Sequence, residues 1–306
     1  MHSVATRCRA AAPAIAFLLA LAHAAPVEAQ ADSTITVVTY NIHAGKDAEQ
    51  RPNLDRVAAV LDTLGADIVL LQEVDRRTRR SAGVDQIGEL ERLTGMRGAF
   101  GKSLDYQGGE YGIAALSRWP IELARVLPLP TEPPLKRSNG SYDPLVALHV
   151  VVATPAGRVH VVNTHLTAEG PGTNRKQQLV ALLAHVRRLV PPGEALVVGG
   201  DFNARPESDE IAATSLALAD AWAACGEGAG HSFPAHAPDR RIDYLFLRGL
   251  RCTGARVHAT TASDHRPVVV EVRPARRGGQ SSAWLEAPAP HGARGASSGA
   301  PSAQRQ

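Results

Sequence analysis

The sequence predicts an α/β (α+β) fold, a four-layer α/β/β/α sandwich in which two mainly antiparallel sheets pack face to face between helices. Three observations support this class. Runs rich in Val, Ile and Leu recur at the length of strands, and a few segments with apolar residues at helical spacing interrupt them. Continuous apolar runs such as 195–198 and 268–270 imply strands that are buried on both faces. Helices outside two stacked sheets provide that burial most economically.

The first half of the chain begins with a predicted strand at 35–42. A helix follows, in which apolar residues recur from Leu54 to Leu64 until Gly65 ends it. A buried strand at 67–72 precedes a second helix, which is marked by Val84, Ile87, Leu90 and Leu93. Further strands are expected near 97–101, 111–118, 121–127, 144–153 and 157–166.

The second half contains a third predicted helix, which begins near Thr173 and stops at Pro191-Pro192 because proline cannot continue a helix. Three final strands are expected at about 194–200, 242–248 and 267–273, with a helix or loop region at 206–224 between the first two. Chemically reactive side chains then fall at strand ends. Two packed sheets can bring such ends into one pocket.

The N-terminal residues differ in character from this middle part. Arg7 and Arg9 precede an apolar run at 10–22 that ends in small residues, which is the layout of a secretory signal peptide over residues 1–29. Two cleavage sites are open, Ala22-His23-Ala24 and Val27-Glu28-Ala29. A membrane anchor is the alternative, but the run is shorter than the roughly 20 apolar residues of a spanning helix. We therefore expect an exported protein, periplasmic or extracellular, with no stable membrane span.

The C-terminal residues 274–306 are dominated by Ala, Gly, Ser, Pro and Arg and predict a disordered tail. One domain of residues 30–273 remains, which we expect to be monomeric. The net charge of the chain is +3, and the predicted signal peptide (+1) and tail (+3) leave −1 for this domain. Such a domain lacks the broad positive field of non-specific nucleic-acid binders.

The candidate chemistry lies in five short strings, which are Thr39-Tyr40-Asn41-Ile42, Leu71-Gln72-Glu73, Asn163-Thr164-His165-Leu166, Gly200-Asp201-Phe202-Asn203 and Ser263-Asp264-His265-Arg266-Pro267. Each alone has an ordinary explanation, such as an exposed strand end or an Asp-x-Asn turn. Their joint occurrence, each beside an apolar strand, resembles the endonuclease/exonuclease/phosphatase superfamily. The resemblance covers 36–272 and includes Tyr111-Gly112, Leu116-Ser117-Arg118 and Arg241-Ile242-Asp243-Tyr244.

This resemblance implies a phosphoesterase that depends on Mg²⁺ (or Mn²⁺). The ion would be held by Asn41, Glu73 and Asp264, and carboxylate oxygens are the hard ligands that such ions prefer. Asp201 would orient and deprotonate the attacking water.

The remaining residues of the implied site would act on the phosphate. Asn203 would hold it, and His165 and His265 would each donate to a phosphoryl oxygen. Asp243 would orient the imidazole of His265 and favour its protonated form.

Two positions depart from the better-known relatives. His43 stands where exonuclease III-like enzymes carry an acidic metal ligand, so one ion is expected rather than two. Ile113 stands where many relatives have Asn. Either Glu110 or Tyr111 would then orient His165, or both have a structural role at the strand edge.

Other features have two interpretations each. The run 75–80 holds four arginines and either grips phosphates or forms a solvated loop, which we favour. His231 and His236 either line the pocket rim or are ordinary core or surface histidines. Gly108-Gly109 predicts a flexible turn. Beyond the predicted signal peptide, the two cysteines, Cys225 and Cys252, are either a disulfide or two buried thiols.

The function predicted from the sequence is hydrolysis of a phosphodiester. Nucleic acid, a phospholipid headgroup and a sugar phosphate remain open as substrates. Aromatic residues make up only 4% of the chain, so base-stacking platforms would be few. The alternatives are a phosphomonoesterase acting on a soluble sugar or inositol phosphate, and a catalytically silent binding module of the same fold.

Overall fold

A computed structural model describes residues 34–130, 132–134, 136, 144–168 and 172–275. The predicted signal peptide and, from residue 276 onward, the predicted tail lie outside the described residues. Within the described part, no helix is long and apolar enough to cross a membrane.

The first sheet has six strands in the order β11-β12-β1-β2-β4-β3. Their bounds are β1 Ile35–Asn41, β2 Ile68–Arg76, β3 Arg97–Tyr106, β4 Gly109–Ser117, β11 Leu250–Val257 and β12 Val268–Pro274. Neighbours are antiparallel except β1 and β2, which run parallel. The carboxyl ends of β1 and β2 therefore lie at the same edge of this sheet.

The second sheet also has six strands, in the order β5-β6-β7-β8-β10-β9. Their bounds are β5 Ile121–Leu129, β6 Leu145–Thr154, β7 Gly157–His165, β8 Ala195–Asp201, β9 Ala219–Asp220 and β10 Asp243–Arg248. Here the parallel pair is β7 and β8. Their carboxyl ends, with the amino end of the antiparallel β10, again meet at one edge.

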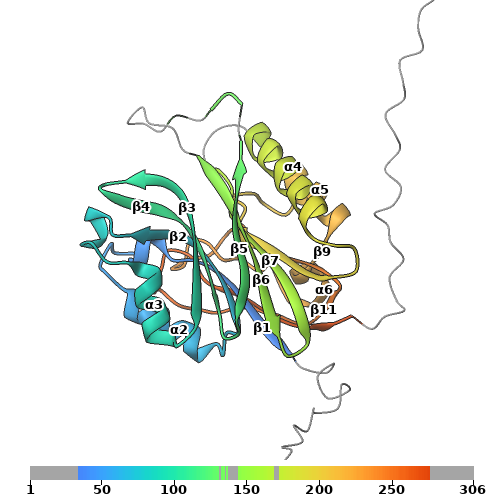
Figure 1. Cartoon of the computed structure of the whole chain (residues 1–306), viewed down its shortest axis with the longest axis horizontal. Coiled ribbons are helices and arrows are strands. Elements are labelled where there is room, and N and C mark those ends of the chain that lie inside the picture. Colours follow the sequence, from blue (N-terminus) through green and yellow to red (C-terminus); the bar gives the residue numbers. More distant parts are fainter. Residues whose placement is uncertain (1–33, 131, 135, 137–143, 169–171, 276–306) are drawn as a thin grey trace, which may run out of the picture.

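Helices cover the outer face of each sheet, as Figure 1 shows for α2 and α3 on one side and α4 and α5 on the other. Their bounds are α2 Leu54–Thr63, α3 Gln86–Thr94, α4 Gly172–Leu189 and α5 Asp209–Ala217; α6 is the short helix Ala221–Cys225, and η1 (His43–Gly45) and η2 (Arg79–Ser81) are 3₁₀ turns. The predicted four-layer sandwich with mainly antiparallel sheets is confirmed.

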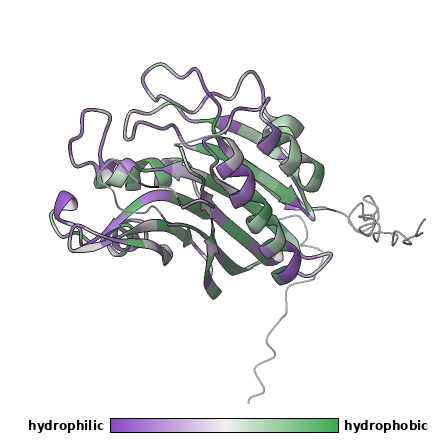
Figure 2. Cartoon of the chain, turned by 90° about the horizontal axis from the view of Figure 1, so that it is seen from above, coloured by the Kyte–Doolittle hydropathy of each residue, from purple (hydrophilic) through white to green (hydrophobic). Residues whose placement is uncertain are grey.

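Alternation along the strands explains why three apolar layers form. On β2, Leu70 faces the other sheet and packs in the central core, whereas Leu71 faces α2 and α3. On β8, Val197 and Val198 divide in the same way between the central core and the layer under α4. The strands are accordingly the most apolar part of the molecule in Figure 2. The continuous apolar runs of the sequence are these doubly buried strands.

Three expectations about the strands were wrong. The chain forms β11 between the last two predicted strands, β2 continues four residues beyond Gln72, and β3 continues to Tyr106 instead of ending near 101. β11 is an edge strand whose polar residues, such as Arg251 and Thr253, are exposed, so it lacks a long apolar run. β2 continues because a β-bulge between Leu71 and Val74 interrupts the pairing without ending it.

The sequence alone did not decide whether the two cysteines form a disulfide, and the structure shows that they do. Cys225 of α6 and Cys252 of β11 form a disulfide, with their Cα atoms 6.0 Å apart. Because α6 follows β9 of the second sheet and β11 belongs to the first, the bond connects the two sheets at their outer edge. Closing a loop of this length stabilises a fold by about 3 kcal/mol.

A second connection between the sheets is a pair of buried amides. Gln72 of β2 donates from Nε2 to Oδ1 of Asn163 on β7, at 2.7 Å. Asn163 donates from Nδ2 to the carbonyls of Leu71 and Ala114, each at 2.8 Å, so one side chain of the second sheet binds two strands of the first. Both amides are fully buried. These bonds set the distance between the strand ends that carry Glu73 and His165.

We expect Asn163→Leu to lower the free energy of unfolding by about 3 kcal/mol or more, measured by urea denaturation. It removes three buried hydrogen bonds, one between the amides of Gln72 and Asn163 and two from Asn163 to the carbonyls of Leu71 and Ala114, and each contributes about 0.5–1.5 kcal/mol. The double variant Gln72→Leu/Asn163→Leu should lose less than the sum of the single variants, because both amides are then removed. Additive losses would contradict the pairing.

Candidate functional site

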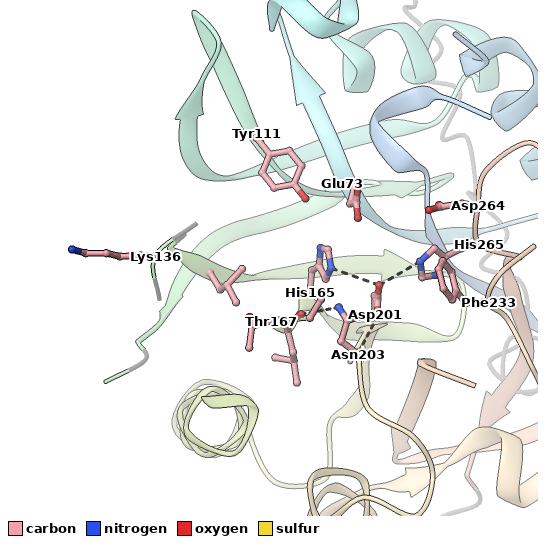
Figure 3. A pocket seen from close by; sticks show the side chains of 13 residues that line it. Glu73, Tyr111, Lys136, His165, Thr167, Asp201, Asn203, Phe233, Asp264 and His265 are labelled. Atoms are coloured by element: carbon pink, nitrogen blue, oxygen red, sulfur yellow. Dashed lines mark hydrogen bonds and ion pairs between the residues drawn. The ribbon is translucent and has the colours of Figure 1, made fainter. Parts of the chain in front are cut away.

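The strand ends of the two sheets surround a cavity of about 280 Å³, shown in Figure 3. Six of the eight predicted site residues line it, namely Glu73, His165, Asp201, Asn203, Asp264 and His265. The other two, Asn41 and Asp243, lie directly behind this wall and hydrogen-bond to lining residues. The register explains the convergence, because Asp201 of β8 lies between His165 of β7 and Asp243 of β10.

Asn41 connects two carboxylates of the site. Its Nδ2 lies 3.1 Å from Oε1 of Glu73 and 3.1 Å from Oδ2 of Asp201, while its Oδ1 accepts from the backbone N–H of His43 at 3.0 Å. The side chain is buried. Asn41, predicted as a metal ligand, is thus a bridge between Glu73 and Asp201 whose amide oxygen keeps one free lone pair.

Glu73 lies at the β-bulge of β2 with a left-handed backbone (φ 55°). Bulges re-aim side chains, and here the carboxylate points into the cavity (Figure 3). Burial would raise the pKa of Glu73, but His165, the hydrogen bond from Asn41, and His265 together lower it below its usual range. Glu73 therefore stays ionised at neutral pH.

The bulge is held from behind by Gln86, the first residue of α3. Its Oε1 accepts from the backbone N–H of Asp75 at 2.8 Å, and its Nε2 donates to the carbonyl of Ala44 at 2.6 Å. One buried side chain thus fastens both the segment after Asn41 and the segment after Glu73. No motif in the sequence indicated this residue, because its role depends on two long-range contacts.

The run 75–80 is not the solvated loop that we predicted. Asp75 is fully buried and accepts a two-point ion pair from Arg80, at 2.7 and 2.8 Å, and a hydrogen bond from Thr78 at 2.8 Å. Arg80 also lies over the rings of Tyr106 and Tyr111. Charge density alone suggested a loop, but the buried carboxylate organises this segment around itself.

Asp201 lies between two imidazoles at the base of the cavity. Its Oδ2 is 3.6 Å from Nε2 of His165 and 3.7 Å from Nε2 of His265, and its Oδ1 accepts from the N–H of Asn203 at 2.9 Å. Burial and the neighbouring charge of Asp243 raise the pKa of Asp201, although the two histidines oppose them. Asn203 donates from Nδ2 to the carbonyl of Leu166 at 2.9 Å, which fixes its position.

Asp243 holds His265 from the side away from the cavity. Its Oδ2 lies 2.9 Å from Nδ1 of His265 and accepts from the hydroxyl of Ser232 at 2.6 Å. Burial alone would lower the pKa of His265, but Asp243, Asp201 and Asp264 raise it to about 10. His265 is therefore a cation at neutral pH. The ring of Phe233 packs against it at 4.6 Å between centroids.

Asp264 lies at the cavity rim with its side chain one-third exposed. Its carboxylate points toward Glu73 in Figure 3 and lies 3.7 Å from Nδ1 of His43. The hydroxyl of Ser263 donates to the carbonyl of Asn41 at 2.8 Å and joins this segment to β1. His43, which replaces the acidic ligand of better-known relatives, thus lies beside a carboxylate.

The open alternatives around His165 are partly resolved. Glu110 is committed to Arg76 at 2.7 Å and Lys102 at 3.4 Å, so it does not orient His165. Tyr111 lines the cavity. Ile113 is buried in the core between the sheets, where the Asn of many relatives would need a partner.

The remaining candidates have ordinary positions. His231 is half-buried, and its Nδ1 lies 3.2 Å from the carbonyl of Pro238. His236 is exposed and faces a second depression rather than this cavity. Gly108 forms the predicted turn between β3 and β4 with φ 82°. Gly109 is required by space, because a Cβ there would lie 2.4 Å from the carbonyl oxygen of Arg76.

The donors of the site fit a divalent metal ion. Asp201, Asp243 and His265 form a buried group whose ligand atoms lie within 4.8 Å of one another, which is compatible with such an ion. Two donors already occupy Oδ2 of Asp243, however, whereas Glu73 and Asp264 face the cavity with oxygen atoms. An ionised glutamate beside a partly exposed aspartate suits a hard cation that keeps part of its water shell.

We expect the imidazole of His265 to titrate at about pH 10 in metal-free protein, as measured by NMR of labelled histidine. A raised pKa means that the ion pair stabilises the fold fully below the ordinary histidine pKa of about 6.5 and ceases to do so as pH rises through about 10. Asp243→Asn should lower the pKa of His265, whereas Ser232→Ala, which keeps the carboxylate, should leave it raised. Titration of wild-type His265 near 6.5 would contradict the pairing.

Comparisons with known proteins agree with this geometry. Residues 38–265 match the Endonuclease/Exonuclease/phosphatase family. The chain is 27% identical over 254 residues to the uncharacterized protein YbhP of Escherichia coli strain K12, covering 77% of this chain and 95% of that protein.

Solved structures share the fold. The endonuclease/exonuclease/phosphatase of Beutenbergia cavernae has a TM-score of 0.67 and 25% identity, covering 79% of this chain and 72% of that one. The Bacteroides thetaiotaomicron protein described as mannosyl-6-phosphatase Bt3783 has a TM-score of 0.65 and 18% identity, covering 78% and 99%. The superfamily resemblance predicted from the strings at the strand ends is confirmed. The chain belongs to the endonuclease/exonuclease/phosphatase family and has the fold of a phosphoester hydrolase.

Proposed function

We propose that this chain is a divalent-metal-dependent phosphoesterase that hydrolyses a phosphodiester through a water prepared by Asp201. One observation carries the proposal. A buried carboxylate with a raised pKa lies between two imidazoles at 3.6 and 3.7 Å, in a cavity that also presents the carboxylates of Glu73 and Asp264. A base, two imidazole donors and carboxylates that suit a metal ion thus share one wall.

The roles of the residues follow from their charges. Asp201 holds a water at Oδ2 and takes its proton, and a raised pKa brings this base closer to neutral pH, where proton transfer is most efficient. His265, charged because Asp243 binds its Nδ1, presents Nε2–H to a phosphoryl oxygen. His165 and Asn203 bind the same phosphate from the other side of Asp201.

Glu73, Asp264 and the free lone pair of Asn41 would hold one Mg²⁺ or Mn²⁺. The ion would neutralise charge on the phosphoryl oxygens and stabilise the leaving alkoxide. Glu73 can serve because its neighbours keep it ionised despite burial. We propose one ion rather than two because His43 occupies the place of a further acidic ligand.

Phosphomonoesterase activity on a soluble sugar or inositol phosphate is a second candidate. The cavity of about 280 Å³ suits a single phosphate with a small substituent. A structural relative with the same fold is described as a mannosyl-6-phosphatase, so another protein of this fold is described as acting on a sugar phosphate. A catalytically silent binding module is the weaker alternative, because all eight residues keep chemically competent side chains.

We further propose that the protein is exported. The support is the arrangement of Arg7 and Arg9 before the apolar run at 10–22. The intact mass of protein recovered outside the cytoplasm checks this, since retention of all residues of the leader would contradict cleavage.

Hydrolysis of bis(4-nitrophenyl) phosphate should require an added divalent metal, because the carboxylates of Glu73 and Asp264 both line the cavity and can hold one. Glu73→Gln keeps the size of the side chain but removes its charge, so the metal concentration for half-maximal activity should rise about tenfold or more. Glu110→Gln, whose carboxylate pairs with Arg76 and Lys102, is the matched control. Full activity after exhaustive EDTA treatment would overturn the metal dependence.

Asp201→Asn should lower kcat by about two to four orders of magnitude, because the amide keeps the shape and hydrogen bonding but cannot take a proton. KM should change little. Steady-state kinetics beside Asp209→Asn, which changes an exposed carboxylate paired with Lys176, provide the comparison. If Asp201→Asn retained a tenth or more of the wild-type kcat, Asp201 would not be the base.

A further inference from the structure

A second depression of about 410 Å³ lies beside the catalytic cavity, lined by Arg56, Ala235, His236, Thr260, Thr261 and Arg266. It shares two wall segments with the cavity. Phe233, Asp264 and His265 face the catalytic side, and the residues that follow them closely face the depression. The segments touch each other, since the N–H of Ala235 donates to the carbonyl of Asp264 at 2.6 Å. A ligand in the depression is therefore a neighbour of a phosphate in the cavity.

Two guanidinium groups make the depression cationic. Among the described residues, neither Arg56 nor Arg266 has a carboxylate within salt-bridge distance, and each makes one side-chain hydrogen bond. Arg56 donates to the hydroxyl of Thr261 at 3.3 Å, and Nε of Arg266 donates to the carbonyl of Ala235 at 2.7 Å. Several N–H donors of both groups remain for a ligand. Arginine stays charged at all physiological pH values and recognises phosphate oxygens through paired N–H groups.

The backbone segments around the depression are held by other contacts. Asn53, which precedes α2, donates to the carbonyl of Ala262 at 2.8 Å and so fastens the loop that carries Thr260 and Thr261. The backbone N–H of Arg266 donates to the carbonyl of Ser232 at 2.7 Å. The backbone of the depression is therefore ordered before an anion binds, which lowers the entropy cost of binding.

We propose that this depression binds a second phosphate group of the substrate, so that the preferred substrates carry two phosphates. The proposal rests on the phosphoesterase function above and narrows its substrate class. The predicted domain has a net charge of −1, so two unpaired arginines are a local feature rather than part of a general basic surface. Small bisphosphates and short nucleotides carry the same second phosphate and are told apart by experiment.

The test compares kcat/KM within substrate pairs that differ by one phosphate, namely fructose 6-phosphate with fructose 1,6-bisphosphate and the dinucleotide TpT with pTpT. The wild type should have a kcat/KM about tenfold higher for the doubly phosphorylated member of at least one pair. The pair that shows this preference tells whether the second phosphate belongs to a small bisphosphate or to a nucleotide. Arg56→Gln should remove most of that preference through KM, since a charged hydrogen bond contributes about this factor. Arg56→Glu should reverse it.

Arg251→Gln is the matched control, because Arg251 is exposed on β11, lines neither cavity, and changes the net charge equally. It should keep the preference. Equal kcat/KM within both pairs, or a preference that survives Arg56→Glu, would overturn the proposal.

A binding measurement separates this proposal from the catalytic one. Calorimetry with inorganic pyrophosphate on EDTA-treated protein should show an affinity that falls about tenfold in Arg56→Gln and stays constant in Arg251→Gln. If no phosphate ester is hydrolysed but this pattern holds, the proposed function fails and the anion site stands. Equal pyrophosphate affinity in both variants would exclude the site.

Discussion

Two buried amide side chains, those of Gln72 and Asn163, connect the two sheets at the edge that carries the candidate site residues. Because each amide is fully buried, its donors and acceptor need protein partners, and the bonds that they make hold β7 against both β2 and β4. Apolar packing alone would tolerate small shifts of one sheet over the other. The amide pair does not, so Glu73 and His165, which follow the two amides by one and two residues, face each other across the cavity.

Electrostatic balance is the second constraint on this edge. Asp201 and Asp243 are direct neighbours on antiparallel strands, an arrangement that costs free energy when both are ionised. The charged imidazole of His265 lies against both and compensates them. The carboxylates of the site differ in pKa as a result of their surroundings. The pKa of Glu73 is lowered, whereas that of Asp201 is raised. Such opposite shifts suit one group to bind a cation and the other to accept a proton.

The same loops serve two neighbouring surfaces. The segments 233–236 and 264–266 place aromatic, acidic and imidazole side chains on the catalytic side and Arg266 and His236 on the other. Their backbones are hydrogen-bonded together, so the two surfaces adjoin the same pair of segments. The catalytic cavity and the proposed second phosphate site would therefore be formed by one hydrogen-bonded pair of segments.

The sequence by itself determined the layers and the strings near the strand ends. Apolar periodicity records which face of each element is buried, and Asn41, Glu73, His165 and Asp201 each lie at or near the end of a predicted strand. Tertiary structure alone decided the rest. β11 lacks an apolar run because it is a half-exposed edge, Asp75 is buried because Arg80 neutralises it, and Gln86 acts through two contacts distant in sequence. The disulfide between Cys225 and Cys252 likewise depends on which segments become neighbours in the fold. The same holds for the depression that Arg56 and Arg266 both line. The local pattern of apolar residues in the sequence indicates which side chains are buried. Charge compensation and long-range hydrogen bonds form only when the sheets pack together.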